Sequence, residues 1–306
     1  MNKRQLGKSD LYLSEISLGC MSLGTDEKKA SRIIDEALDA GINYLDTADL
    51  YDFGRNEEIV GKAIKNRRQD ILLGSKVGNN FDRNKEDWFW DPSKEHIKKG
   101  VKDSLQRLGT DYIDLYQLHG GTIEDNIDES IEAFEELKQE GVIREYGISS
   151  IRPNVIREYA KRSNIVSVMM QYNALDRRPE EEMLDFLHGN DISVLARGPL
   201  AKGMLSDHAK EVATKKADDG FLQYSKEEML AITEQYTDYA SGERSLNALA
   251  LQYVLHHPAV ASAVFGASSV DQLHENLGYL EAAPMTEQLF GELQALTKPI
   301  KYDKHR

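Results

Sequence analysis

The run Ile71-Leu72-Leu73-Gly74-Ser75-Lys76 is a short apolar segment that ends on a lysine. A second run, Ile113-Asp114-Leu115-Tyr116-Gln117-Leu118-His119, follows further along the chain and ends on a histidine. Between the two runs, apolar residues recur with the spacing of a helix at Ile97, Val101, Leu105 and Leu108. A strand, a helix and a second strand in this order predict a βα repeat with parallel strands.

The same alternation continues along almost the whole chain. The segments predicted as strands are Ile16–Gly19, Asn43–Leu45, Ile71–Ser75, Ile113–Leu118, Val142–Ile148, Ile165–Met170, Ile192–Ala196 and Val260–Phe265. Repeated βα units in one uninterrupted chain predict an α/β fold, a (β/α)8 TIM barrel that forms a single domain over residues 1–306. A doubly wound sheet is the main alternative, but the first strand lacks the G-x-G-x-x-G segment typical of that fold.

Three further segments have a predicted place in the barrel. Residues 77–93, which follow the third strand and contain both tryptophans, and residues 198 to about 244, which follow the seventh, are longer than ordinary connections. The second segment is expected to include a helix near Lys226–Tyr239. Long segments after strand ends are where barrels build active sites. The residues from Arg4 to Tyr12 are predicted to form a small N-terminal β-hairpin.

The composition is typical of a globular protein that does not bind nucleic acid. Of 306 residues, 40% are hydrophobic and 29% are charged, and the net charge is −14. This acidic balance argues against nucleic acid as a partner, because binding phosphate backbones needs a basic surface. No run approaches the roughly 20 apolar residues of a membrane span. Cys20 is the only cysteine and Met1 to Gly7 lack a secretory pattern, so we expect a cytoplasmic protein.

Four polar residues at or just after predicted strand ends form a chemical set: Asp46, Tyr51, Lys76 and His119. A tyrosine is a poor proton donor at neutral pH, since free phenols ionise near pH 10, but a neighbouring ammonium favours the phenolate. Asp46 is a suitable partner that keeps Lys76 charged when it is enclosed. His119 can orient a carbonyl oxygen beside the tyrosine hydroxyl.

Each of these residues also has an ordinary structural interpretation. A lysine at a strand end is usually solvated, a tyrosine after a strand usually packs, and Asp46-Thr47 can cap a helix. A catalytic role is favoured because all four residues occur in order at the same end of one predicted barrel. This set resembles the acid–base residues of the aldo-keto reductases, and the resemblance runs from about residue 3 to about residue 280. It implies NAD(P)H-dependent reduction of aldehydes or ketones, with Tyr51 as general acid and the hairpin closing the barrel bottom.

The resemblance also implies a cofactor site built from several strand ends. Its predicted residues are Gly19, Met21, Ser149, Ser150, Gln171, Arg197, Pro199, Leu200, Lys202, Gly266, Ser268, Ser269, Gln272 and Asn276. Ser149, Ser150 and Gln171 would hold the nicotinamide carboxamide, and Lys202 would meet the pyrophosphate. Ser268 and Ser269 open a helix whose backbone N–H groups suit a phosphate, although helix capping explains these serines equally well. Gln272 and Asn276 would contact the adenine.

Two features, at three positions, depart from the family pattern. Arg197 stands where many relatives carry an aromatic residue that stacks on the nicotinamide. A planar guanidinium can stack, reach an anionic group of cofactor or substrate, or pair with a carboxylate. Gly266 and Gln272 stand where basic residues often bind the 2′-phosphate. We expect NADP(H), with NADPH preferred over NADH.

The substrate side is expected to be lined by Trp88 and Trp90, together with Met21, although the two tryptophans are equally suited to packing their loop. No metal site is predicted, because His256-His257 have no third ligand at zinc-like spacing. We expect a monomer that acts on small carbonyl compounds. The alternatives are a cofactor-binding regulatory or channel-associated subunit with little turnover, and a hydrolase that uses Asp46 and Asp49.

Overall fold

Parallel strands form a closed eight-stranded barrel in the computed structural model, which describes residues 1–216, 220–240 and 244–306. Around the barrel the order is β10-β11-β12-β3-β4-β5-β8-β9, so strands adjacent in the chain are also neighbours in space. The strands are β3 (Ile16–Gly19), β4 (Tyr44–Asp46), β5 (Leu72–Val77), β8 (Ile113–Leu118), β9 (Ile143–Ser149), β10 (Ser167–Gln171), β11 (Ser193–Arg197) and β12 (Val260–Gly266). The predicted (β/α)8 barrel is confirmed, and each strand lies within a few residues of its predicted place.

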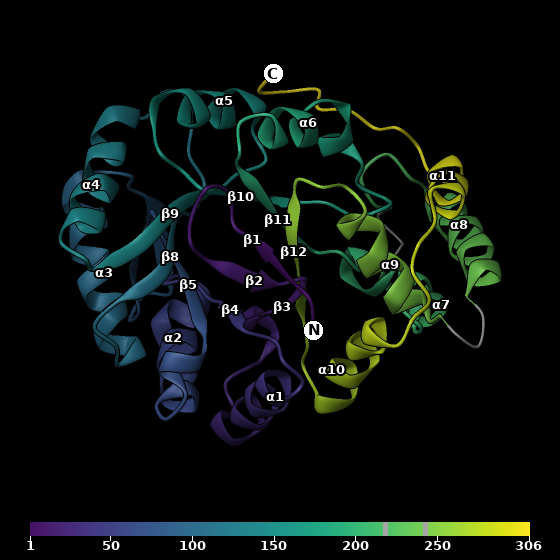
Figure 1. Cartoon of the computed structure of the whole chain (residues 1–306), viewed down its shortest axis with the longest axis horizontal. Coiled ribbons are helices and arrows are strands. Elements are labelled where there is room, and N and C mark those ends of the chain that lie inside the picture. The colour runs from purple at the N-terminus through teal and green to yellow at the C-terminus, as the bar shows by residue number, and fades with distance from the viewer. Residues whose placement is uncertain (217–219, 241–243) are drawn as a thin grey trace.

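Helices surround the strands (Figure 1). They are α1 (Glu27–Asp39), α2 (Arg55–Ile64), α3 (Lys94–Leu108), α4 (Ile127–Gln139), α5 (Pro153–Arg162), α6 (Met183–His188), α7 (Ala209–Lys216), α8 (Lys226–Tyr239), α9 (Leu246–Leu255), α10 (Val270–Leu277) and α11 (Glu287–Ala295). Short 3₁₀ turns occur at η1 (Cys20–Ser22), η2 (Tyr51–Gly54), η3 (Arg68–Asp70), η4 (Arg178–Glu181), η5 (Ala201–Gly203) and η7 (Gly278–Leu280). Local sequence sets several helix ends: the Ser93 side chain caps the start of α3, and Gly109, at φ 63°, ends it in the left-handed region.

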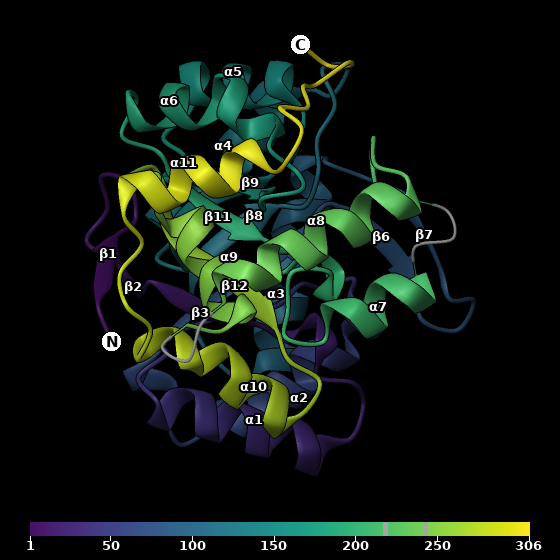
Figure 2. The same ribbon diagram turned by 90° about the vertical axis from the view of Figure 1, so that its right-hand side faces the viewer.

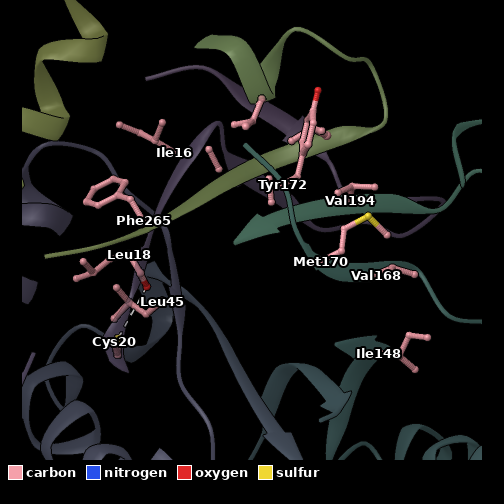
Figure 3. Packing of buried hydrophobic residues seen from close by; sticks show 14 of the residues in the cluster. Ile16, Leu18, Cys20, Leu45, Ile148, Val168, Met170, Tyr172, Val194 and Phe265 are labelled. Atoms are coloured by element: carbon pink, nitrogen blue, oxygen red, sulfur yellow. Dashed lines mark hydrogen bonds between the residues drawn. The ribbon is translucent and has the colours of Figure 1, made fainter. Parts of the chain in front are cut away.

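Side chains alternate between the two faces of each barrel strand, as the two-residue period of a strand requires. On β4, Leu45 joins the large cluster between strands and helices, whereas Tyr44 joins a smaller cluster inside the barrel. Figure 3 shows members of the outer cluster, among them Leu18, Leu45 and Phe265. The inner cluster therefore marks which strand positions point toward the barrel axis.

The N-terminal hairpin closes the bottom of the barrel. Strands β1 (Lys3–Gln5) and β2 (Tyr12–Ser14) pair antiparallel, as predicted. Leu6, Leu11 and Leu13 of this hairpin are almost fully buried and belong to the inner cluster. Because this end is filled with leucine, only the carboxyl end of the strands remains for a site.

Both long segments have regular structure. Residues 77–93 contain an antiparallel hairpin, β6 (Asn79–Asp82) and β7 (Asp87–Trp90), instead of an irregular loop. The segment after β11 contains η5, α7 and the predicted helix, α8 (Lys226–Tyr239), while its residues 217–219 and 241–243 lie outside the described part of the chain. Figure 2 shows β1 and β2 toward one end of the molecule, with β6, β7 and α7 toward the other. No helix in the described part of the chain has the length and apolarity needed to cross a membrane.

Candidate active site

Three adjacent strands bring the predicted acid–base residues into the barrel. In the register of β4 against β5, Asp46 lies opposite Gly74, and in that of β5 against β8, Lys76 lies opposite Gln117. Asp46 is two residues from the interior Tyr44, so its side chain also faces inward. The closed sheet therefore gathers groups that are far apart in sequence.

Lys76 is the centre of the resulting network. Its side chain is fully buried, and its Nζ donates to Asp46 Oδ2 at 2.5 Å, to the Thr47 carbonyl oxygen at 2.8 Å and to Tyr51 Oη at 3.3 Å. These contacts use all three ammonium hydrogens. Burial by itself lowers the pKa of Lys76, but the nearby Asp46 and Tyr51 outweigh it and the pKa lies above its usual value. The lysine is therefore charged at neutral pH.

Tyr51 is presented by an unusual turn. It opens η2, in which Asp52 and Phe53 have φ values of 47° and 50°. Residues other than glycine seldom adopt this left-handed conformation, and such positions cluster at functional sites. The Tyr51 ring meets the His119 ring edge-on, with centroids 5.8 Å apart. The turn thus places the phenol between a buried ammonium and an imidazole.

His119 is held uncharged at the end of β8. Its backbone N–H donates to the Val77 carbonyl oxygen at 2.7 Å, and its Nδ1 has no hydrogen-bond partner among the described residues. Burial, followed by the charges of Lys76 and Arg197, lowers the pKa of His119 from 6.5 to about 3. A neutral imidazole next to the Tyr51 hydroxyl can hydrogen-bond a substrate oxygen.

Sequence reasoning missed three groups that hold this network. Tyr44 Oη and Gln117 Nε2 both donate to Asp46 Oδ1, and the Thr47 carbonyl oxygen accepts from Lys76. The two-residue period of the strands was the available signal, because Tyr44 shares a strand face with Asp46, and Gln117 with His119.

The predicted carboxamide residues lie at the ends of β9 and β10, the two strands that follow β8 around the barrel, and Arg197 ends β11 beside them. Arg197 Nη1 donates to Gln171 Oε1 at 3.3 Å, so these two side chains are in contact. Ser149 ends β9, and Ser150 follows it with its backbone N–H bonded to the Met169 carbonyl oxygen. Arg197 lies close enough to His119 for its positive charge to contribute to the lowered pKa of that imidazole, which places its guanidinium at the same mouth as the acid–base set.

The residues after β11 make a tight turn. Pro199 is buried, Leu200 packs against the outer cluster, and Lys202 is exposed in a left-handed conformation at φ 58°. The Gly198 carbonyl oxygen accepts from Asn173 Nδ2, which fixes this turn to the end of β10. Lys202 is exposed on this turn, so its ammonium can meet an anion at the surface.

The start of α10 is only partly free. Ser269 caps the helix by accepting from the Gln272 backbone N–H, and Gln272 Oε1 accepts from both the N–H and the hydroxyl of Ser268. Asn276 is buried and its Oδ1 accepts from Asn247 at 2.7 Å, so it faces α9. The structure gathers Ser268, Ser269 and Gln272 at an exposed helix start but places Asn276 inside.

Gly19 and Gly266 lie side by side at the ends of β3 and β12. A Cβ added to Gly266 would lie 2.5 Å from Ser22 Oγ, so a glycine allows this close approach. Met21, in the turn after β3, is 63% exposed.

The two tryptophans have different environments. Trp90 is half-buried, with its ring against Gly78 and Gly120, and its Nε1 donates to Asp125 Oδ1 at 3.0 Å. Trp88 is 52% exposed on the same strand. Trp90 therefore fixes the β6–β7 hairpin to the barrel, which leaves Trp88 as the tryptophan accessible to a ligand.

The donor set fits a nicotinamide nucleotide. A buried His119 nitrogen without a partner among the described residues, an amide and a guanidinium on neighbouring strand ends, and the start of α10 after β12 all lie at one end of the barrel. Within the described ranges, no three His, Cys, Asp or Glu side chains are arranged to hold a metal ion.

Comparisons with known proteins agree with this geometry. Residues 15–298 match the sequence profile described as the Aldo/keto reductase family. The chain is 59% identical to an uncharacterized oxidoreductase, YqkF, of Bacillus subtilis (strain 168), with all of both chains covered. It is 31% identical to the NADH-specific methylglyoxal reductase of Escherichia coli (strain K12), covering 92% of this chain and 94% of that protein.

A solved structure gives the same result. The holo form of an aldo-keto reductase from Bacillus halodurans superposes with a TM-score of 0.93 at 58% identity, covering 100% of this chain and 99% of that one. The resemblance inferred from Asp46, Tyr51, Lys76 and His119 is therefore confirmed at the level of the family. The chain belongs to the aldo/keto reductase family, oxidoreductases that work with nicotinamide cofactors and whose general activity is carbonyl reduction.

Proposed function

We propose that this protein reduces small aldehydes or ketones to alcohols with NADPH. The supporting observation is a fully buried ammonium, Lys76, which bonds the Asp46 carboxylate and the Tyr51 hydroxyl at once, beside a neutral imidazole. A bound nicotinamide nucleotide would supply the hydride. The chain's part is to orient the substrate and to handle the proton.

In this mechanism, His119 hydrogen-bonds the carbonyl oxygen and holds it next to Tyr51 Oη. Tyr51 donates its proton to that oxygen as the alcohol forms. The adjacent Lys76 ammonium stabilises the negative charge left on the phenol, and Asp46 keeps the lysine protonated. The hydrolase alternative is weaker, because Asp46 is engaged by Lys76 rather than paired with a second carboxylate.

The cofactor would lie from the β9–β11 ends to the start of α10. Ser149, Ser150 and Gln171 are the proposed carboxamide contacts, with Arg197 near the nicotinamide. Gly19 and Met21 would contact the cofactor beside β3, and Pro199, Leu200 and Lys202 the pyrophosphate. The adenosine and its 2′-phosphate are proposed to bind at Gly266, Ser268, Ser269, Gln272 and Asn276. Because Asn276 is buried, it would lie beneath the other four residues at this site. The protein is proposed to be a cytoplasmic, single-domain monomer with Trp88 and Trp90 on the substrate side.

Two titrations and a screen test the proposal. NADPH and NADH are titrated separately by fluorescence quenching, and aldehydes and ketones, including methylglyoxal, are then screened by loss of absorbance of the reduced nicotinamide. We expect tighter binding of NADPH and turnover with at least one simple aldehyde. Tight cofactor binding with no turnover on any carbonyl would favour a regulatory subunit, and absence of binding would contradict both functions.

A further inference from the structure

The Asp46 carboxylate divides its contacts between its two oxygens. Oδ2 accepts from Lys76 Nζ at 2.5 Å, and Oδ1 accepts from Tyr44 Oη at 3.1 Å and from Gln117 Nε2 at 3.3 Å. Tyr44 and Gln117 are both fully buried. The acid–base set therefore rests on a second layer of two hydrogen-bond donors inside the barrel.

Gly74 leaves the space that this layer needs. The Tyr44 ring crosses β5 at that residue, and a Cβ added there would lie 2.1 Å from Tyr44 Oη and 2.7 Å from its Cζ. Real carbon atoms do not approach so closely, so any larger residue would displace the ring and its hydroxyl. The position directly opposite Asp46 in the β4–β5 register is thus kept empty for the hydroxyl that bonds Asp46.

The layer has a direct geometric effect on Tyr51. Lys76 uses its three hydrogens on Asp46, Thr47 and Tyr51, so its ammonium cannot follow one partner without weakening its bond to another. If the Asp46 carboxylate turned, Lys76 would move with it and away from the Tyr51 hydroxyl. Two donors on Oδ1 oppose that rotation, because it would leave them buried and unpaired.

We propose that Tyr44 and Gln117 are positioning residues for the reduction: by fixing Asp46 Oδ1 they hold Lys76 within hydrogen-bond distance of Tyr51. This inference rests on the proposed function. Neither residue touches substrate or cofactor in the proposed mechanism, so the expected signature is a loss of kcat without a loss of binding.

Tyr253 provides a matched control. It is also a fully buried tyrosine whose hydroxyl donates to a carboxylate, Glu180 Oε1, at 2.6 Å, but it lies on α9 outside the barrel. Tyr253→Phe and Tyr44→Phe therefore remove the same kind of hydrogen bond. Only the second removes it from the acid–base set.

The experiment compares steady-state kinetics, NADPH binding and urea unfolding for these variants. Tyr44→Phe should lower kcat about tenfold, the effect expected when a hydrogen bond to a charged group is lost, with KM and the NADPH Kd changed less than twofold. Gln117→Met should show the same pattern if Tyr44→Phe fails to fold. Tyr253→Phe should keep the wild-type kcat.

A double variant shows whether the effect passes through Asp46. In an Asp46→Asn background, Tyr44→Phe should cause less than a twofold further loss of kcat. The change that Tyr44→Phe causes in the free energy of unfolding by urea should also differ between this background and the wild type. Wild-type kcat in both Tyr44→Phe and Gln117→Met would overturn this inference and leave the proposed function intact. A full tenfold loss in the Asp46→Asn background would also overturn it. A wild-type protein without turnover would overturn the proposed function and this inference with it.

Discussion

Asp46→Asn keeps the shape of the side chain but removes the charge that faces Lys76. The lysine side chain is fully buried, and after the substitution its ammonium would keep only the Thr47 carbonyl oxygen and the Tyr51 hydroxyl as firm acceptors. Removing one partner of a buried ion pair typically costs about 3–5 kcal/mol, because the other charge remains buried without compensation. We expect Asp46→Asn to lower the free energy of unfolding by this amount at pH 7 and to cause a large loss of turnover.

The pH dependence of this loss identifies Lys76 as its source. In the wild type the pKa of Lys76 is raised, so its stabilising effect is present at neutral pH and lost only as the pH rises through that raised pKa. In the variant, burial without Asp46 lowers the pKa of Lys76 in the folded protein. The unfolded chain still binds this proton up to its usual pKa of about 10.4, so protonation of Lys76 favours unfolding at pH values between the two. The stability difference should therefore shrink by about 2 kcal/mol or more between pH 7 and pH 10.

Asp114→Asn is the control, measured with the same urea unfolding series. Asp114 is also buried, but its partners are Arg68 and Arg144, both at 2.9 Å, and arginine stays charged throughout this range. Its loss should be nearly the same at pH 7 and pH 10. If the Asp46→Asn loss were equally independent of pH, or below about 1 kcal/mol at pH 7, the ion pair would not control the state of Lys76.

Three other substitutions test separate parts of the site. His119 has a pKa of about 3 in the folded protein and of about 6.5 in the unfolded chain, so its contribution to stability falls as the pH drops below 6.5, by at most about 2 kcal/mol at pH 5. Thermal melts should show the wild type losing stability relative to His119→Gln between pH 8 and pH 5. Melting temperatures that change in parallel for the two proteins would contradict this. Arg197→Met should bring the NADP⁺ and NADPH dissociation constants closer together by a few fold, because a guanidinium beside the nicotinamide disfavours its cationic oxidised form. An unchanged ratio of the two dissociation constants would place Arg197 away from the nicotinamide ring. Trp90→Phe removes the hydrogen bond to Asp125 and should destabilise the β6–β7 hairpin by about 1 kcal/mol. Amide hydrogen exchange should become faster in that hairpin alone. Unchanged exchange would show that Trp90 does not fix the hairpin to the barrel.

The fold could be predicted because apolar runs and helical spacings alternate regularly, and because strand order in a closed parallel sheet follows chain order. The set of Asp46, Lys76 and His119 followed from their places at or near strand ends. The β6–β7 hairpin was missed because residues 83–86 contain no glycine, so the usual hairpin turn signal is absent.

Contacts within the site were less predictable, since they depend on register and on helix rotation. Tyr44 reaches Asp46 along its own strand, but Gln117 meets Asp46 only because the register of β4, β5 and β8 brings these positions together. The orientation of Asn276 toward Asn247 depends on how α10 packs against α9, which the spacing within α10 alone does not define. The role of Arg197 beside Gln171 also remains a prediction that the cofactor titrations test.

A comparison of Tyr51→Phe with the wild type tests the catalytic assignment most directly. The substitution removes one hydroxyl, whose only hydrogen bond within the described part of the chain comes from Lys76 at 3.3 Å, and leaves the ring against His119. NADPH titration by fluorescence should give a Kd within twofold of the wild type, while turnover of the best aldehyde falls by at least about a thousandfold. Turnover at the wild-type rate in this variant would show that the phenol is not the proton donor.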